Sequence, residues 1–163
     1  MKRRIVLAFS VSVAMSATIG FAGLSRALPS DVRAPGFACT VTSGGAEGQF
    51  VNQGNQSTSN SLSLACPIPD VYNGVQGVSQ VQVNILDHST TASATATLCV
   101  SLLFGGTSCG SVVSAPTAVT GFYTLVPPTF ADWTAPNFGY ALVTLPRRVS
   151  GSAATTITGT HAF

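Results

Sequence analysis

Charged side chains are scarce in this 163-residue sequence, where Asp, Glu, Lys and Arg together make up 7% of the residues. The one lysine and three of the arginines precede residue 28, in a segment that we expect to be removed. The charged residues that remain are Asp31, Arg33, Glu47, Asp70, Asp87, Asp132, Arg147 and Arg148. Because nucleic-acid-binding surfaces cluster basic side chains, this composition excludes nucleic acid as a partner.

Helical hydrophobic periodicity is also absent after the first 27 residues, and a period of two replaces it. Val81, Val83 and Ile85 alternate with polar neighbours, which is typical of a strand with one buried face. The same alternation covers residues 92–102, and Gly105-Gly106 then supplies a hairpin turn. Nine short strands are predicted on such patterns, over residues 37–42, 49–52, 61–66, 78–86, 92–102, 107–113, 119–126, 138–145 and 153–163, with residues 53–60 as an exposed loop. This spacing predicts an all-β fold, a single antiparallel β-sandwich of jelly-roll or immunoglobulin-like type.

The N-terminus has the pattern of a helical signal peptide. Lys2-Arg3-Arg4 is basic, the following run to Leu24 is uncharged and mostly apolar, and small residues allow cleavage after Ala22 or Ala27. A retained membrane anchor is the alternative, because a run of this length can span a bilayer, although serines and glycines interrupt it. We therefore expect a signal peptide over residues 1–27, a flexible lead-in over 28–36 and a β-sandwich domain over 37–163. The protein is expected to be secreted or periplasmic, with no stable membrane insertion after cleavage.

All four cysteines lie in the part of the chain that remains after cleavage. An even number of cysteines in an exported domain predicts two disulfides. Pairing Cys39 with Cys66 and Cys99 with Cys109 is preferred, because each bridge closes a local loop between neighbouring strands, and two other pairings stay open. No two cysteines stand two to four residues apart, so the spacing argues against a zinc site, and neither metal nor cofactor is expected.

Several short motifs occur together in this part of the chain. They are the first cysteine, Cys66-Pro-Ile68, a strand of the form Val81-x-Val-x-x-x-Asp87, a strand with Cys99 and a late strand with Tyr140. With the signal peptide, they resemble a loose group of uncharacterised exported bacterial β-sandwich proteins. The resemblance covers most of the mature chain and implies a β-sandwich with no known activity. That group tends to carry its last cysteine in the tyrosine strand, whereas this strand has none. The resemblance therefore leaves the pairing of Cys99 open, with Cys109 as the substitute partner.

Asp87-His88-Ser89 contains the residue types of a nucleophilic triad. Contiguous residues in extended chain point to alternate sides, whereas a triad needs all three groups to converge on one carbonyl position. The triplet is therefore predicted to be a polar cap between two strands. A hydrolase would need Asp87 or Asp132 beside His88 or His161, and we expect no catalytic residues and no enzyme activity.

Asp132-Trp133 is the other candidate site, because an acidic residue beside an aromatic plate suits a sugar ring. The carbohydrate-binding hypothesis requires Trp133, Tyr123 and Tyr140 to share one exposed surface. In the alternative, Trp133 plugs the open end of the sandwich. The sequence as a whole favours an exported non-enzymatic β-sandwich with a structural, adhesive or assembly role. Its alternative is a carbohydrate-binding module around Trp133, so the expected partners are copies of itself or a surface glycan.

Overall fold

The computed structural model describes residues 32–44, 47–48, 53–68, 78–134 and 137–163. The predicted signal peptide and the predicted strand over residues 49–52 lie outside these ranges. No helix in the described part of the chain is long and apolar enough to cross a membrane.

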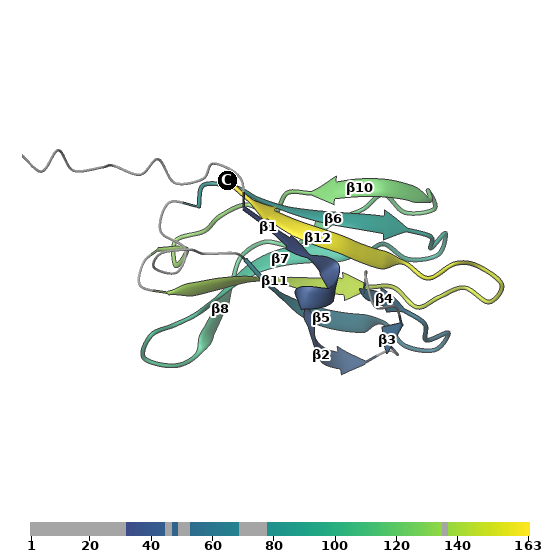
Figure 1. The fold of residues 1–163 in the computed structure, drawn as a ribbon, viewed down its shortest axis with the longest axis horizontal. Helices are drawn as coiled ribbons and strands as arrows, with labels where there is room; N and C mark the ends of the chain where they lie inside the picture. Colours follow the sequence, from purple (N-terminus) through teal and green to yellow (C-terminus); the bar gives the residue numbers. More distant parts are fainter. Residues whose placement is uncertain (1–31, 45–46, 49–52, 69–77, 135–136) are drawn as a thin grey trace, which may run out of the picture.

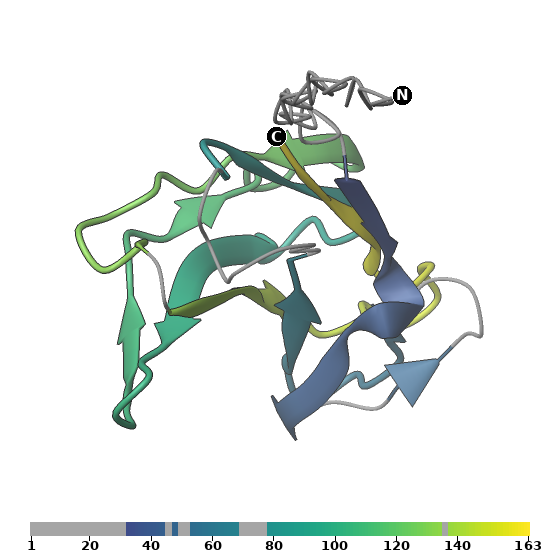
Figure 2. The same cartoon turned by 60° about the vertical axis from the view of Figure 1, so that its left-hand side comes forward.

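The described strands form two antiparallel sheets that face each other (Figure 1 and Figure 2). The first sheet has the strand order β10, β6, β12, β4, β3, and β1 also pairs with β12. Its strands are β1 (Val32–Pro35), β3 (Glu47–Gly48), β4 (Gln53–Asn55), β6 (Val81–Asp87), β10 (Gly121–Leu125) and β12 (Thr156–Ala162). The prediction of an all-β fold with antiparallel strands is confirmed.

The second sheet has the order β2, β5, β11, β7, β8, and β9 also pairs with β7. Its strands are β2 (Thr40–Gly44), β5 (Leu62–Pro67), β7 (Thr95–Ser101), β8 (Thr107–Cys109), β9 (Val113–Ser114) and β11 (Phe138–Leu145). β11 runs between β5 and β7, so two strands distant in sequence flank it and lock the centre of this sheet.

The core lies between the sheets because alternate residues of the central strands point inward. In β6, Val81, Val83 and Ile85 are fully buried while the residues between them are partly exposed, as the alternation predicts. Leu98 and Val143 are also fully buried, from the second sheet. Full burial of one such side chain stabilises a fold by roughly 1.5–3 kcal/mol, so this interior is the main source of stability.

The N-terminal end of the domain differs from the predicted layout. Residues 28–36 are predicted as a flexible lead-in, yet Val32–Pro35 forms β1, an ordered strand paired with the last strand of the chain. The first strand, predicted over residues 37–42, begins only at Thr40, because Gly36–Ala38 forms a short 3-10 helix, η1. Backbone pairing with β12 fixes this segment, and prolines are tolerated at such an edge.

The predicted exposed loop over residues 53–60 also begins as a strand. Gln53–Asn55 is β4, and it pairs with β12. The Asn55 side chain is fully buried, and its amide donates hydrogen bonds to the carbonyl oxygens of Asn60 (2.8 Å) and Pro146 (3.0 Å). A polar side chain is stable inside the fold here because backbone acceptors satisfy it.

Both disulfides have the preferred pairing. Cys39 is bonded to Cys66 and Cys99 to Cys109, and the described residues contain no free cysteine. Cys99 and Cys109 are direct partners in the register of β7 and β8, so the second bridge crosses a hairpin. The first bridge joins Cys39, which lies between η1 and β2, to Cys66 in β5, and the second joins β7 to β8.

Candidate functional site

Asp87-His88-Ser89 lies at the junction that follows β6 and does not form a triad. The buried Asp87 carboxylate accepts hydrogen bonds from the backbone N–H groups of Ser89 (2.8 Å) and Ala94 (3.2 Å) and from the Thr155 hydroxyl (2.9 Å). The Ser89 hydroxyl oxygen accepts from two backbone N–H groups of the next turn. Since these groups hold the chain together, the triplet is the polar cap that the sequence predicts.

Trp133 offers no open aromatic face, because its side chain is only 7% exposed. The indole Nε1–H donates to the Val78 carbonyl oxygen at 3.2 Å, and the ring lies against Phe130 with 6.1 Å between centroids. The neighbouring Asp132 is exposed and accepts a hydrogen bond from the Ser108 hydroxyl. The loop therefore fits a structural Trp, because a sugar ring would find no surface on which to stack.

Tyr123 and Tyr140 do not join Trp133 in a shared surface, which corrects the requirement set for this site. Tyr123 lies in β10 of the first sheet, is packed against the core and donates its hydroxyl to the Val119 carbonyl oxygen at 3.1 Å. Tyr140 lies in β11 of the second sheet, opposite Cys99. The two tyrosines thus belong to different sheets, and the buried Trp133 presents no face that could join them in an exposed platform.

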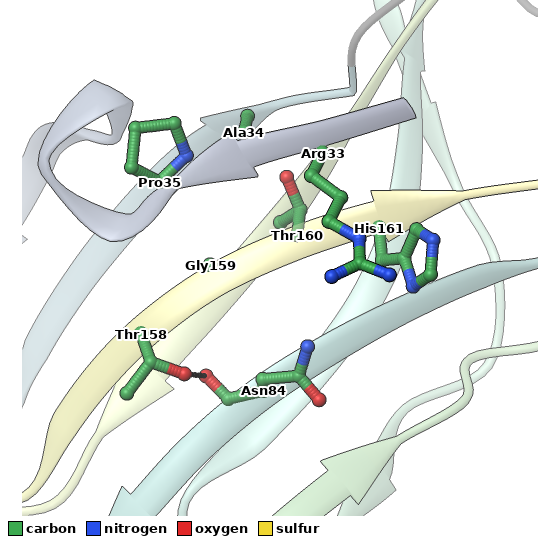
Figure 3. Close-up of a pocket in the computed structure, with 8 residues that line it drawn as sticks. All are labelled: Arg33, Ala34, Pro35, Asn84, Thr158, Gly159, Thr160 and His161. Carbon is green, nitrogen blue, oxygen red and sulfur yellow. Dashed lines mark hydrogen bonds between the residues drawn. The ribbon is translucent and has the colours of Figure 1, made fainter. Parts of the chain in front are cut away.

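A pocket of about 400 Å³ opens instead on the outer face of the first sheet, where β1, β12 and β6 run side by side (Figure 3). The strand register brings its residues together. Arg33 lies opposite His161, and Gly159 lies between Pro35 on one side and Asn84 on the other. The residues that line the pocket are Arg33, Ala34, Pro35, Asn84, Thr158, Gly159, Thr160 and His161.

Hydrogen-bond donors converge in this pocket. Figure 3 shows the Arg33 guanidinium, the Asn84 amide nitrogen and the His161 ring directed toward the same space. The Thr124 hydroxyl donates to Asn84 Oδ1 at 2.8 Å, which orients the amide so that its nitrogen faces the pocket. Within the described residues Asn84 Nδ2 makes no hydrogen bond to the protein, so this donor is open to a ligand.

Two further contacts hold the walls of the pocket. The Thr158 hydroxyl donates to the Asn84 backbone carbonyl at 3.1 Å, at the position where the β12 register shifts against β6. The His161 ring lies 4.0 Å from that of Phe163, measured between centroids. These contacts fix the imidazole and the strand beneath it before any ligand arrives, which lowers the cost of ordering them on binding.

Two glycines allow β1 and η1 to approach β12 closely. A Cβ placed on Gly159 would lie 2.6 Å from the Ala34 carbonyl oxygen, and one on Gly36 would lie 2.2 Å from the Ile157 carbonyl oxygen. Such contacts are far shorter than van der Waals distance, so a side chain at either position would push the N-terminal segment outward. The glycines thereby set the position of Arg33 against His161.

Sequence reasoning missed this pocket because it placed Arg33 in a flexible lead-in and considered His161 only as a possible partner of Asp87 or Asp132. One available signal was the alternation itself, which places Asn84 on the outer face of β6. A second was the final strand, where Thr158 and His161 are polar positions between small residues. The missing information was the pairing of β1 with β12, which joins the two ends of the domain.

The described part of the chain brings together no metal-binding cluster. Among the described residues, no three His, Cys, Asp or Glu side chains are close enough to hold a metal ion. The described residues that line the pocket around His161 include no Asp or Glu. The described lining of the pocket thus offers hydrogen-bond donors from Arg33, Asn84 and His161.

No protein-family model matches the chain, and no curated protein matches its sequence. Similar solved structures include Arthrobacter globiformis T6 isomalto-dextranase complexed with panose, at 13% identity and a TM-score of 0.41, covering 82% of this chain and 23% of that one. Another is an exo-beta-1,3-galactanase from Phanerochaete chrysosporium with beta-1,3-galactotriose, at 15% identity and a TM-score of 0.29, covering 82% and 27%. This chain spans about a quarter of the length of these proteins.

Proposed function

We propose that this protein is a non-catalytic, exported adhesion protein that binds a surface glycan in the pocket between β1, β6 and β12. The observation that carries the proposal is the convergence of Arg33, Asn84 and His161 on one space. Saccharide hydroxyl and carboxylate oxygens accept hydrogen bonds from such groups. The volume of about 400 Å³ suits a small ligand, since binding pockets usually measure roughly 300–1,000 Å³.

Export is supported by the two disulfides and by the predicted signal peptide. Disulfides persist in oxidising compartments and are rare in the cytosol. We also propose that the sandwich has a jelly-roll or immunoglobulin-like topology. The same proposal includes a relationship to the exported bacterial group that the sequence resembles.

Glycans that carry a carboxylate are the proposed ligand class. A guanidinium pairs with a carboxylate through two parallel hydrogen bonds, a geometry that a hydroxyl cannot match. Among the described residues that line the pocket, the ionisable side chains are those of Arg33 and His161, which suit an anionic group. The Asn84 amide nitrogen then serves a hydroxyl or the second carboxylate oxygen.

The experiment is a glycan array with matched neutral and uronic-acid saccharides. The purified protein is expected to bind the acidic members, and Arg33→Gln and Asn84→Ala are each expected to weaken binding about tenfold, as loss of a charge-assisted or open donor would. Arg147→Gln is the control, because Arg147 is exposed on a loop outside the pocket and its substitution removes the same charge. Equal loss in Arg33→Gln and Arg147→Gln would contradict a localised site.

Assembly with copies of itself is a second candidate function, and the edge strand β10 favours it. In the described residues β10 pairs on one side only, with β6. It carries no charge, and Phe122 on it is 60% exposed. Uncharged edge strands with exposed apolar side chains tend to pair with other chains.

A further inference from the structure

The hairpin between β7 and β8 ends in an exposed apolar tip, defined here as Leu103, Phe104 and the neighbouring Phe138. Phe104 is 99% exposed, Leu103 55% and Phe138 62%. Phe138 belongs to this tip because it lies opposite Ser101, the last residue of β7 before the turn. Consecutive exposed apolar residues are unfavourable in water, which makes this cluster a sign of an interaction surface.

The tip projects from the sandwich and is stiff. Figures 1 and 2 both show the β7–β8 hairpin extending away from the rest of the sheet. The bridge between Cys99 and Cys109 closes the base of the hairpin, and Gly105 and Gly106 adopt the positive φ angles that the tight turn needs. A preformed tip loses little conformational entropy when it binds.

Three backbone N–H groups of the turn have acceptors within the fold. Leu102 N–H donates to the Gly106 carbonyl at 3.1 Å, and Gly105 N–H donates to the Leu102 carbonyl at 2.9 Å. The Leu103 N–H donates to Asn137 Oδ1 at 3.4 Å. A tip that enters an apolar phase needs such internal bonds, because unpaired backbone groups cost several kcal/mol there.

Charge around the tip points to lipid in place of a second copy. Between His88 and Asp132 the sequence contains no charged residue, so the hairpin itself carries no ionised side chain into an apolar layer. The exposed Asp132 carboxylate lies against Ser108, next to the Cys109 bridge and outside the turn that carries Leu103 and Phe104. A protein partner would need an apolar hollow for a convex tip. On a second copy, the pocket between β1, β6 and β12 is lined by the polar side chains of Arg33, Asn84 and His161, so it does not suit the apolar Phe104 side chain.

We propose that the apolar tip inserts Leu103 and Phe104 reversibly into the interfacial layer of a lipid bilayer. The insertion is peripheral, so the sandwich stays in water while Phe104 enters at the level of the headgroups and upper acyl chains. Because Arg147 and Arg148 follow β11, at the opposite end of that strand from Phe138, binding is independent of anionic lipid. This surface is separate from the proposed glycan pocket, and either proposal can fail without the other.

The test is flotation of the purified protein with phosphatidylcholine vesicles. The wild-type protein floats with the vesicles, and Phe104→Ser lowers the partition coefficient about tenfold. Phe122→Ser removes another exposed phenylalanine, 60% exposed on β10, and leaves the partition coefficient unchanged. Absence of wild-type binding, or an equal loss in both variants, overturns the proposal. The proposal is also overturned if the protein forms a dimer without lipid, detected by light scattering, if Phe104→Ser dissociates that dimer, and if the wild-type protein does not bind vesicles.

A second measurement tests depth without removing the apolar side chain. Phe104→Trp places a reporter at the tip, while the buried Trp133 contributes a constant background. Vesicles are expected to shift the emission of this variant to the blue, and lipids brominated on the upper acyl chain are expected to quench it. Phe122→Trp should show neither change, and an unshifted spectrum for Phe104→Trp contradicts insertion.

Discussion

At the scale of single residues, Thr155 links the last strand to the buried Asp87 carboxylate. Its hydroxyl donates to Asp87 Oδ1 at 2.9 Å and accepts from the His88 N–H at 3.1 Å. Thr155→Val keeps the shape but leaves both groups short of a partner, which is expected to lower the free energy of unfolding by about 1–3 kcal/mol. Urea denaturation measures the change, and the exposed Thr117→Val is the control. A loss of unfolding free energy no larger than that of Thr117→Val would mean that the hydrogen bonds of Thr155 do not stabilise the fold.

Gly159 is the residue on which the position of β1 depends. In Gly159→Ala the new methyl group meets the Ala34 carbonyl, so we expect a loss of about 1–3 kcal/mol in unfolding free energy, together with weaker glycan binding as Arg33 moves. Gly121→Ala is the matched control, because its Cβ meets only ordinary contacts of 3.6 Å and longer. Thermal melting and the glycan assay check the two effects. An unaltered melting temperature in Gly159→Ala would contradict the close approach.

Prediction from sequence succeeded for the disulfides, because each bridge joins cysteines that are close along the chain. Cys39–Cys66 and Cys99–Cys109 are both local pairings, and both are present. It left two interpretations of Trp133 open, a plug and a sugar platform, and the structure has the buried plug, because the burial of one aromatic depends on Val78 and Phe130, which approach it only in the folded chain. Nothing in the local pattern of residues 130–134 distinguishes a plug from a platform.

At the scale of elements, the two disulfides are expected to differ in their contributions. By loop-closure entropy, a bridge across 27 residues stabilises more than one across 10, by about 1 kcal/mol. Burial adds to the difference, because Cys39 and Cys66 lie in the core whereas Cys109 is exposed. The double variant Cys39→Ala/Cys66→Ala should therefore lose more stability than Cys99→Ala/Cys109→Ala, as measured by guanidinium unfolding. The reverse order would contradict this account.

Strands were predictable from sequence wherever one face of the strand is buried and the other is exposed to solvent. β6 and β5 follow strict alternation, and their burial repeats with a period of two. β1 and β4 were missed because they are three or four residues long and their partners lie about a hundred residues away in β12. Pairing between distant segments leaves no local signature, and the candidate pocket depends on that pairing.

At the scale of the whole molecule, the β10 edge predicts association between copies at high concentration. Thr124→Lys places a charge on this edge strand and is expected to abolish any dimer that forms through it. Sedimentation velocity over a concentration series measures the association. Thr124 also orients Asn84, so a second variant without an added charge, Phe122→Ser, is the control. It reports whether dimerisation depends on the backbone edge of β10 or on its exposed side chains. A dimer that persists in Thr124→Lys would exclude this edge.

The most direct test of the central claim is a chemical-shift map of the isotope-labelled protein titrated with a uronic-acid oligosaccharide. The account predicts the largest shifts at Arg33, Asn84 and His161, with smaller ones along β1 and β12, and none around Trp133. Shifts centred on residues 130–134, or an acidic saccharide that moves no resonance of β1, β6 and β12, would contradict it.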